Sequence, residues 1–180
     1  QFRLTTSGTA TGKGMIVAPM WSVSNTASGA ATTTTLVNIF TTGQSTLTLE
    51  AGKQYWFKLI LYPTATFTSG TAAIQFAPTF SQVVQSITYH ARYTNATASS
   101  PFFARYTATG AQTVSSAITA TTTGLIEIEG YFLTNATTGG TLIPQFQMST
   151  TGSSVTMNTY SNIQVMKIGT GIGAVAGTWA

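Results

Sequence analysis

The chain has 180 residues, a length that fits one domain, and it carries only three acidic and seven basic residues, one histidine and no cysteine. Most enzyme chemistry gathers ionisable groups at one site, and this composition supplies almost none. It also provides no disulfides and no thiolate metal ligands. We therefore expect a protein that is not an enzyme and has no cofactor, no metal site and no catalytic residue.

Threonine makes up about a fifth of the chain, and 43% of the residues are hydrophobic, which is ample for a core. Threonine favours strands, whereas residues that build helices, such as Glu, Lys and Leu, are few. No apolar run approaches the roughly 18 residues of a membrane-spanning helix. The basic residues behind the net charge of +4 are scattered. We therefore expect an all-β protein that neither inserts into a membrane nor binds nucleic acid.

Residues 1–33 are rich in Thr, Ser, Gly and Ala around one apolar patch, Met15–Trp21, which Pro19 interrupts. Proline in sheets is confined to edges and bulges, so this segment is predicted to be an N-terminal arm or an irregular first strand. Residues 34–170 alternate between short strands and turn residues, which indicates the main domain. The Gly-rich residues 171–180 are interpreted as a C-terminal tail.

The strongest predicted strand is Gln54–Tyr62. Its odd-numbered residues Tyr55, Phe57, Leu59 and Leu61 share one face, which we assign to the core, and Trp56 lies on the other face. The remaining predicted strands are Thr35–Phe40, Ser45–Glu50, Ala72–Phe76, Gln85–Tyr93, Phe102–Ala108, Leu125–Leu133, Thr141–Met148 and Ser161–Ile168. Eight to ten short strands with no helical period predict an antiparallel β-sandwich.

Four stretches of the sequence carry a further signature: Leu49–Leu59, Leu125–Gly130, Gly140–Phe146 and Tyr160–Ile168. In order and spacing they resemble structural proteins of tailed bacteriophages, in which an AGKTY turn precedes an aromatic strand. The second half of such domains reads hIxIxG, then GTLxxQF, then GSxhxVxxI, where h is apolar. Two positions depart from that pattern. Pro144 lies in the GTL strand, which predicts an edge or a bulge there, and Tyr160 stands where the pattern has glycine.

This resemblance covers roughly residues 34–170 and implies a trimeric jelly roll similar to the tumour-necrosis-factor and complement C1q heads. It implies a structural component of the virion, either a fibre module or a capsid decoration protein. The implied partners are two further copies of the chain in a homotrimer and other virion proteins. The alternative function is a receptor-binding or glycan-binding head of a tail fibre, whose partner is a glycan on the host surface.

Three tryptophans are candidate interface or glycan contacts: Trp56, Trp21 and Trp179. Trp56 is the best candidate for an interface aromatic, because it alternates with Lys58 on the face away from the expected core. The N-terminal Met15–Trp21 patch and the C-terminal tail are expected to dock onto other virion subunits.

One catalytic alternative rests on Glu127 and Glu129. On a strand they share a face about 6–7 Å apart, which approaches the carboxylate separation of inverting glycosidases and would fit a polysaccharide depolymerase. We favour the interpretation that the two glutamates lie on a solvated strand face or pair with Arg105 or Lys167. Nothing else in the sequence supplies a substrate cleft. The single histidine, His90, is placed on the outer side of the predicted strand Gln85–Tyr93 and is interpreted as a surface residue.

Overall fold

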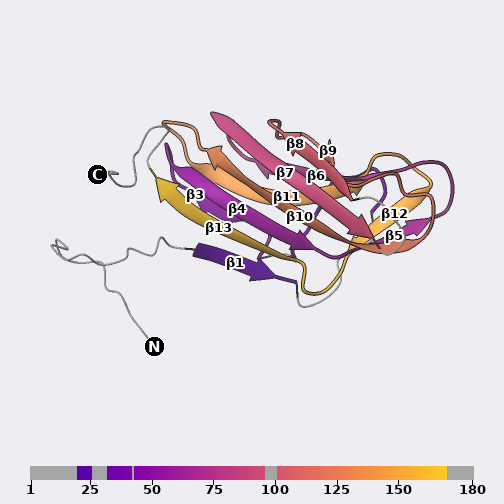
Figure 1. The fold of residues 1–180 in the computed structure, drawn as a ribbon. Helices are drawn as coiled ribbons and strands as arrows, with labels where there is room; N and C mark the ends of the chain where they lie inside the picture. The colour runs from indigo at the N-terminus through magenta and orange to yellow at the C-terminus, as the bar shows by residue number, and fades with distance from the viewer. Residues whose placement is uncertain (1–19, 26–31, 42, 96–100, 170–180) are drawn as a thin grey trace, which may run out of the picture.

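The computed structural model describes residues 20–25, 32–41, 43–95 and 101–169. Within these ranges the protein has thirteen β-strands and no helix, and the strands form two antiparallel sheets packed as a sandwich (Figure 1). The larger sheet consists of β1 (Met20–Ser24), β13 (Asn162–Gly169), β4 (Gln54–Leu61), β5 (Pro63–Phe67), β12 (Ser153–Met157), β10 (Thr122–Leu133), β7 (Ser86–Asn95) and β8 (Phe102–Tyr106). The smaller sheet consists of β2 (Val37–Asn38), β3 (Leu47–Leu49), β11 (Gly140–Met148), β6 (Ile74–Phe80) and β9 (Gln112–Thr113).

In the larger sheet β10 lies between β4 and β7. Outward from β4 come β13 and then β1, and outward from β7 comes β8. β5 continues β4, because β10 pairs with both in one register, and β12 pairs with β5. In the smaller sheet β11 pairs with β2 and β3 on one side and with β6 on the other, and β9 covers part of β6.

The predicted all-β sandwich is confirmed, and so is the predicted core face of β4. Tyr55, Phe57, Leu59 and Leu61 of β4 are buried. Alternating positions of β7 and β10 are buried as well, and they comprise Ile87, Tyr89, Ala91 and Tyr93 in β7 and Ile126, Ile128, Gly130 and Phe132 in β10. Period-2 alternation therefore fixed which side of each central strand meets the core.

The strand count differs from the expected eight to ten. β2 and β3 are short parts of the predicted strands Thr35–Phe40 and Ser45–Glu50, whereas β5, β9 and β12 were not predicted. β9 has only two residues, which is too short for an alternation to be recognised in the sequence. β12 begins at Ser153, at the end of a stretch rich in Ser, Thr and Gly, and only Val155 and Met157 of its three buried residues are apolar. Short strands of this kind are held by their neighbours and not by their own composition.

The bulge predicted at Pro144 is absent, and the predicted edge is present only as a local gap in the pairing of β11. β11 is paired on both sides, and its register with β6 runs without a break from Leu142 to Met148, with Pro144 directly opposite Pro78. The Pro144 carbonyl accepts a hydrogen bond from the Ile39 N–H at 3.0 Å, so the backbone groups of Pro144 point away from β6. They face the gap between β2 and β3, where β11 has no ladder partner, and the missing N–H therefore costs no ladder bond.

Tyr160 occupies the left-handed region of backbone conformation, with φ of 68°. In the bacteriophage pattern this position is glycine, the residue that adopts positive φ without steric cost. In this chain the position is a tyrosine whose side chain is 75% exposed.

An aromatic cluster fills one end of the core, and Tyr89 is its most constrained polar member. Its ring contacts Phe57, Phe76 and Tyr106 at centroid separations of 6.1, 5.8 and 5.4 Å. Burial raises the pKa of Tyr89, and its buried hydroxyl has no hydrogen-bond partner among the described residues. The Tyr106 hydroxyl, in contrast, donates to the Thr113 carbonyl. The cluster therefore contains one satisfied and one unsatisfied hydroxyl.

We expect Tyr89→Phe to raise the free energy of unfolding by about 1 kcal/mol, because it removes a buried hydroxyl that makes no hydrogen bond. The matched variant Tyr106→Phe should lower it by about 1 kcal/mol, since it leaves the Thr113 carbonyl without its donor. Urea unfolding at one fixed protein concentration measures both changes. Destabilisation by Tyr89→Phe equal to that by Tyr106→Phe would contradict the assignment.

Candidate functional site

The solvent side of the larger sheet, called here the outer face, is the side of Trp56. An apolar row crosses this face at one level of the register: Met20 of β1 lies opposite Met166 of β13, Met166 opposite Trp56 of β4, and Trp56 opposite Tyr131 of β10. Met20 is 55% exposed and Tyr131 is 44% exposed. Four large apolar side chains thus lie side by side on a solvent-facing surface.

A polar row follows at the next level of the register. Lys58 lies opposite Glu129, Glu129 opposite His90, and His90 opposite Arg105. The Trp56 Nε1–H donates to Glu129 Oε1 at 2.9 Å and so links the two rows. Next to this bond is a shallow depression of about 310 Å³, whose outer-face lining includes Thr88, His90, Arg105, Glu129 and Tyr131.

The two candidate carboxylates of β10 have different partners from those predicted. Glu127 forms an ion pair with Arg92 at 3.3 Å, because the register sets Arg92 directly opposite it. Arg105 lies one strand further away and donates weakly to Thr88 Oγ1 at 3.4 Å. The expected pairing with Arg105 or Lys167 is therefore wrong. Glu127 is held in an exposed ion pair and Glu129 by Trp56, an arrangement that does not set two carboxylates across a cleft as a glycosidase requires.

Lys167 instead pairs with Glu50, with Nζ 2.7 Å from Oε1. This hydrogen bond lowers the pKa of Glu50 and raises that of Lys167. Both side chains are well exposed, so the pair contributes little to stability. It borders an open depression of about 240 Å³ that Met20, Trp21 and Tyr55 also line.

Of the three candidate tryptophans, Trp56 alone lies on the apolar row. Trp21 is half-buried on the opposite side of β1, where it packs against the core, and Trp179 lies outside the described residues. Met20 belongs to the Met15–Trp21 patch that was expected to dock, of which residues 15–19 lie outside the described residues. Met166 and Tyr131 were not predicted to contribute to an interface. Tyr131 could have been found from its alternation with Phe132, but the cross-strand neighbours of Trp56 are set by the register.

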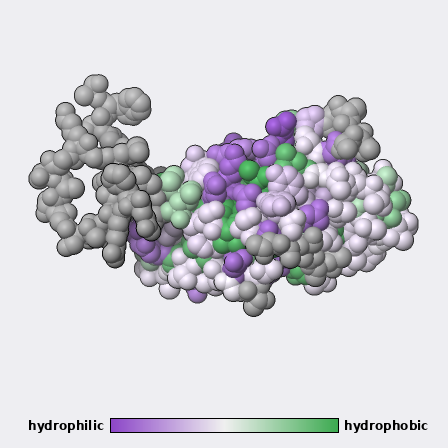
Figure 2. Space-filling model, turned by 90° about the horizontal axis from the view of Figure 1, so that it is seen from below, coloured by the Kyte–Doolittle hydropathy of each residue, from purple (hydrophilic) through white to green (hydrophobic). Residues whose placement is uncertain are grey.

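The surface of the molecule is mixed in hydropathy, as are the apolar and polar rows of the outer face. In Figure 2, which views the molecule from below, hydrophobic residues lie among neutral and hydrophilic ones. Among the described residues, no three His, Cys, Asp or Glu side chains gather closely enough to hold a metal ion. The same part of the chain contains no helix long and apolar enough to cross a membrane.

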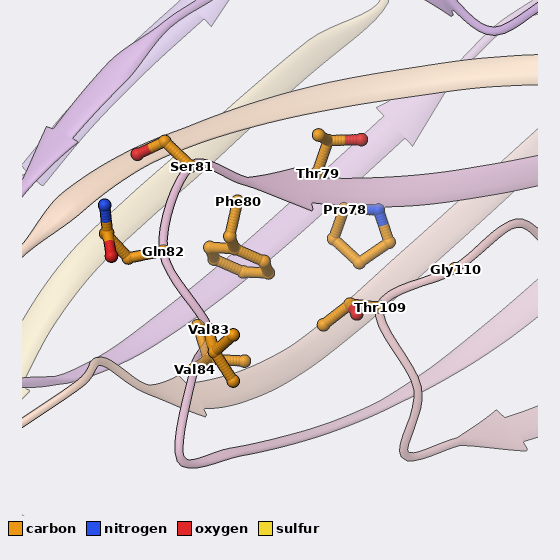
Figure 3. A pocket seen from close by; sticks show the side chains of 9 residues that line it. All are labelled: Pro78, Thr79, Phe80, Ser81, Gln82, Val83, Val84, Thr109 and Gly110. Atoms are coloured by element: carbon orange, nitrogen blue, oxygen red, sulfur yellow. The ribbon is translucent and has the colours of Figure 1, made fainter.

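A second surface feature, the edge groove, lies where β6 leads into β7. It has a volume of about 340 Å³ and is lined by Pro78–Val84 on one side and by Thr109 and Gly110 on the other. In Figure 3 Phe80 lies between Pro78 and the two valines, and Thr109 faces them from the neighbouring segment. Val83 is 83% exposed, the largest value among the exposed large hydrophobic residues in the described ranges.

A scan against models of protein families finds no match for this chain, and a search of curated proteins finds no relative.

Proposed function

We propose that this chain is a non-enzymatic structural component of a tailed-phage virion. It acts as a trimeric jelly-roll module, in a fibre or as a capsid decoration protein, by self-association and by docking to other virion proteins. The observation that carries this proposal is the apolar row Met20–Met166–Trp56–Tyr131 on a solvent-facing sheet. Contiguous exposed apolar side chains of this size are typical of surfaces that bind another protein.

The order of strand pairing supports a jelly-roll topology. β1 pairs with β13 and β4 with β10 in the larger sheet, while β2 and β3 pair with β11, and β6 with β9, in the smaller sheet. The pairs are nested, so the earliest strand meets the last, and successive pairs alternate between the sheets. An antiparallel ribbon rolled into a sandwich has this order. The β7–β8 hairpin extends the larger sheet beyond β10.

Two backbone positions support the resemblance to phage structural proteins. Gly130 ends the hIxIxG stretch, and a Cβ on it would lie 2.3 Å from the Thr88 carbonyl oxygen. Tyr160 stands at the glycine of the GSxhxVxxI stretch and has positive φ. Both glycines of the pattern therefore correspond to positions where this fold leaves no space for a side chain or requires a left-handed backbone.

The absence of ionised side chains from the apolar row supports association through this row. When the surfaces of two subunits associate, the side chains on them become buried. Burial of an unpaired charged side chain would lower the stability of the complex. The apolar row has no ionised group, and its one polar donor, the Trp56 Nε1–H, is already bonded to Glu129. Three copies joined in this way would gain stability without disulfides.

We expect Trp56→Lys to weaken self-association by about 30-fold or more, because central aromatic residues of interfaces contribute about 2 kcal/mol or more. The control is Thr66→Lys, which places the same charge at an exposed position of β5. Native mass spectrometry across a dilution series reads the trimer and monomer populations. A wild-type chain that stays monomeric at high micromolar concentration would contradict self-association. Antibody labelling of particles, imaged by electron microscopy, tests the virion assignment separately.

The depression beside Tyr131 favours a second candidate function, binding of a host-surface glycan. It combines an exposed aromatic ring with Glu129, His90 and Arg105, which offer both acceptors and donors to sugar hydroxyls. The charges of Glu129 and Arg105 cancel, which suits a neutral saccharide. We expect Tyr131→Ala to lower binding on a glycan array about tenfold, whereas Thr66→Ala should leave it unchanged. An array on which the wild type binds no glycan would reject this function.

A further inference from the structure

We propose that the edge groove takes the side chain of Tyr160 from a second copy of this chain, so that copies join end to end. The contact lies outside the apolar row. The inference goes beyond the proposed trimer, because it names an occupant for the groove and a second contact between copies. It applies to single subunits and to trimers alike.

Tyr160 is an exposed aromatic residue on a well-held turn between β12 and β13. Its side chain is 75% exposed, and its backbone has a positive φ, which costs free energy for residues other than glycine. The Tyr160 N–H donates to the Asn25 carbonyl at 2.9 Å, and the Asn162 side-chain amide donates to the Tyr160 carbonyl at 3.0 Å. An aromatic side chain presented on a fixed backbone is typical of an interface anchor, since it loses little conformational freedom on binding.

The groove and the turn match each other in charge and polarity. The groove has an apolar wall that includes Phe80, Val83 and Val84, and its lining carries no ionisable side chain. Residues 158–162 of the turn carry no charged side chain either. Val83 is 83% exposed, so an aromatic ring seated against it would remove apolar surface of both copies from water.

The groove also offers an acceptor for the phenol group. The Ile74 carbonyl accepts from the Val114 N–H at 2.8 Å, so the even-numbered residues of β6 direct their backbone groups to the β9 side. β9 pairs with β6 no further than Phe76, and the Pro78 carbonyl therefore points into the groove without a ladder partner. A buried tyrosine hydroxyl usually finds a hydrogen-bond partner, and this carbonyl supplies one for Tyr160.

The groove and the turn lie at opposite ends of the larger sheet. β10 is antiparallel to both β4 and β7, so these two strands run in the same direction, as their arrows in Figure 1 show. The groove loop leads into the start of β7, whereas the turn leads into β13, whose Asn162 lies opposite Ile60 near the end of β4. The eight residues of β4 span about 26 Å.

This separation decides which copy fills the groove. Tyr160 cannot reach the groove of its own subunit across the length of the sheet, so the occupant comes from another copy. A contact between opposite ends of two copies joins unlike surfaces and leaves one free groove and one free turn, from which the series continues. End-to-end joining of this kind suits the fibre form of the proposed function.

The test is native mass spectrometry in the Trp56→Lys background, which removes the apolar row as a contact. At high micromolar concentration this chain should give a ladder of one, two, three and more copies. Adding Tyr160→Gly should weaken the association about 30-fold, because glycine keeps the turn geometry but lacks the ring. The matched variant Tyr160→Phe should weaken it only about fivefold, through loss of the hydrogen bond to the Pro78 carbonyl.

A complementation experiment tests the groove and the turn together. Val83→Asp should also remove the ladder, because it places a charge in the apolar groove, whereas the isosteric Val83→Thr should preserve most of it. The Tyr160→Gly chain keeps its groove, and the Val83→Asp chain keeps its tyrosine. Mixing the two should therefore restore pairs that contain one chain of each kind, and nothing longer.

Three results would overturn the proposal: no ladder from the Trp56→Lys chain, a ladder that Tyr160→Gly leaves unchanged, or no mixed pair. The trimer is measured separately, on chains that keep Trp56. Trimers without any multiple of three chains would reject the end-to-end contact alone. A ladder from the Trp56→Lys chain without trimers of the wild type would reject trimer formation alone.

Discussion

Gly130→Ala is expected to lower the free energy of unfolding by about 3 kcal/mol or more. Gly130 lies in the centre of β10, opposite Phe57 of β4 and Tyr89 of β7. An added Cβ would lie 2.3 Å from the Thr88 carbonyl oxygen and 2.4 Å from Tyr89 Cβ. Both neighbours belong to a paired strand, so relief of the clash requires β7 to move away from β10 and to lose ladder hydrogen bonds.

The matched control is Gly110→Ala. No heavy atom lies within 4 Å of a Cβ built on Gly110, and its φ is not positive. This substitution should leave stability unchanged or raise it by up to about 1 kcal/mol, because it restricts the unfolded chain. Urea unfolding of both variants at one protein concentration provides the comparison. A Gly130→Ala protein as stable as Gly110→Ala would mean that β7 and β10 are not packed as closely as the structure has them.

Phe132→Ala should cost about 3–5 kcal/mol, the usual range for removing a fully buried aromatic ring. Phe132 is 1% exposed and links the two sheets. Its ring lies 5.2 Å from that of Tyr55 and 5.9 Å from that of Phe57, both in β4, and 5.0 Å from that of Phe80 in the opposite sheet. Loss of the ring leaves a cavity between the layers that β4 and β10, which are paired with each other, cannot close.

Phe103→Ala is the control for this variant. Phe103 is 65% exposed on the outer face and contacts only the Arg92 guanidinium among the aromatic and cation contacts of the described residues, at 5.8 Å. Its removal should cost about 0.5–1 kcal/mol. Thermal unfolding followed by near-UV circular dichroism distinguishes the two variants. Equal losses from Phe132→Ala and Phe103→Ala would contradict the central position of Phe132 in the core.

The sequence predicted the central strands well because their burial is one-sided. In β4 the apolar residues Tyr55, Phe57 and Leu59 alternate with side chains of the outer face. This alternation can be recognised without knowing which strands lie beside β4. The sequences of the peripheral strands are not sufficient to predict where these strands begin and end. β9 has two residues, and β6 continues through Pro78 to Phe80, where the sequence predicted an end. Pairing with neighbours, and not local propensity, extends or creates these strands.

The candidate site was predictable only in part, because a surface on a sheet depends on register. Alternation was enough to put Trp56 and Glu129 on outer sides of their strands. That Trp56 lies opposite both Met166 and Tyr131, and that Glu127 meets Arg92, follows from which strands are neighbours and how they are aligned. The edge groove was not predictable, since it arises where the loop around Thr109, just before β9, lies beside the end of β6.

The nested pairing has a consequence for synthesis of the protein. β13, made last among the described strands, lies between β1 and β4, and β1 has no other partner in the larger sheet. The ribosome must therefore synthesise the roughly 140 residues between β1 and β13 before the strand that joins β1 to β4 can be inserted. Until then β1 and one edge of β4 remain without their neighbour, and the sandwich closes only after translation has passed β13. Contacts of such long sequence separation fold slowly, on the order of milliseconds to seconds.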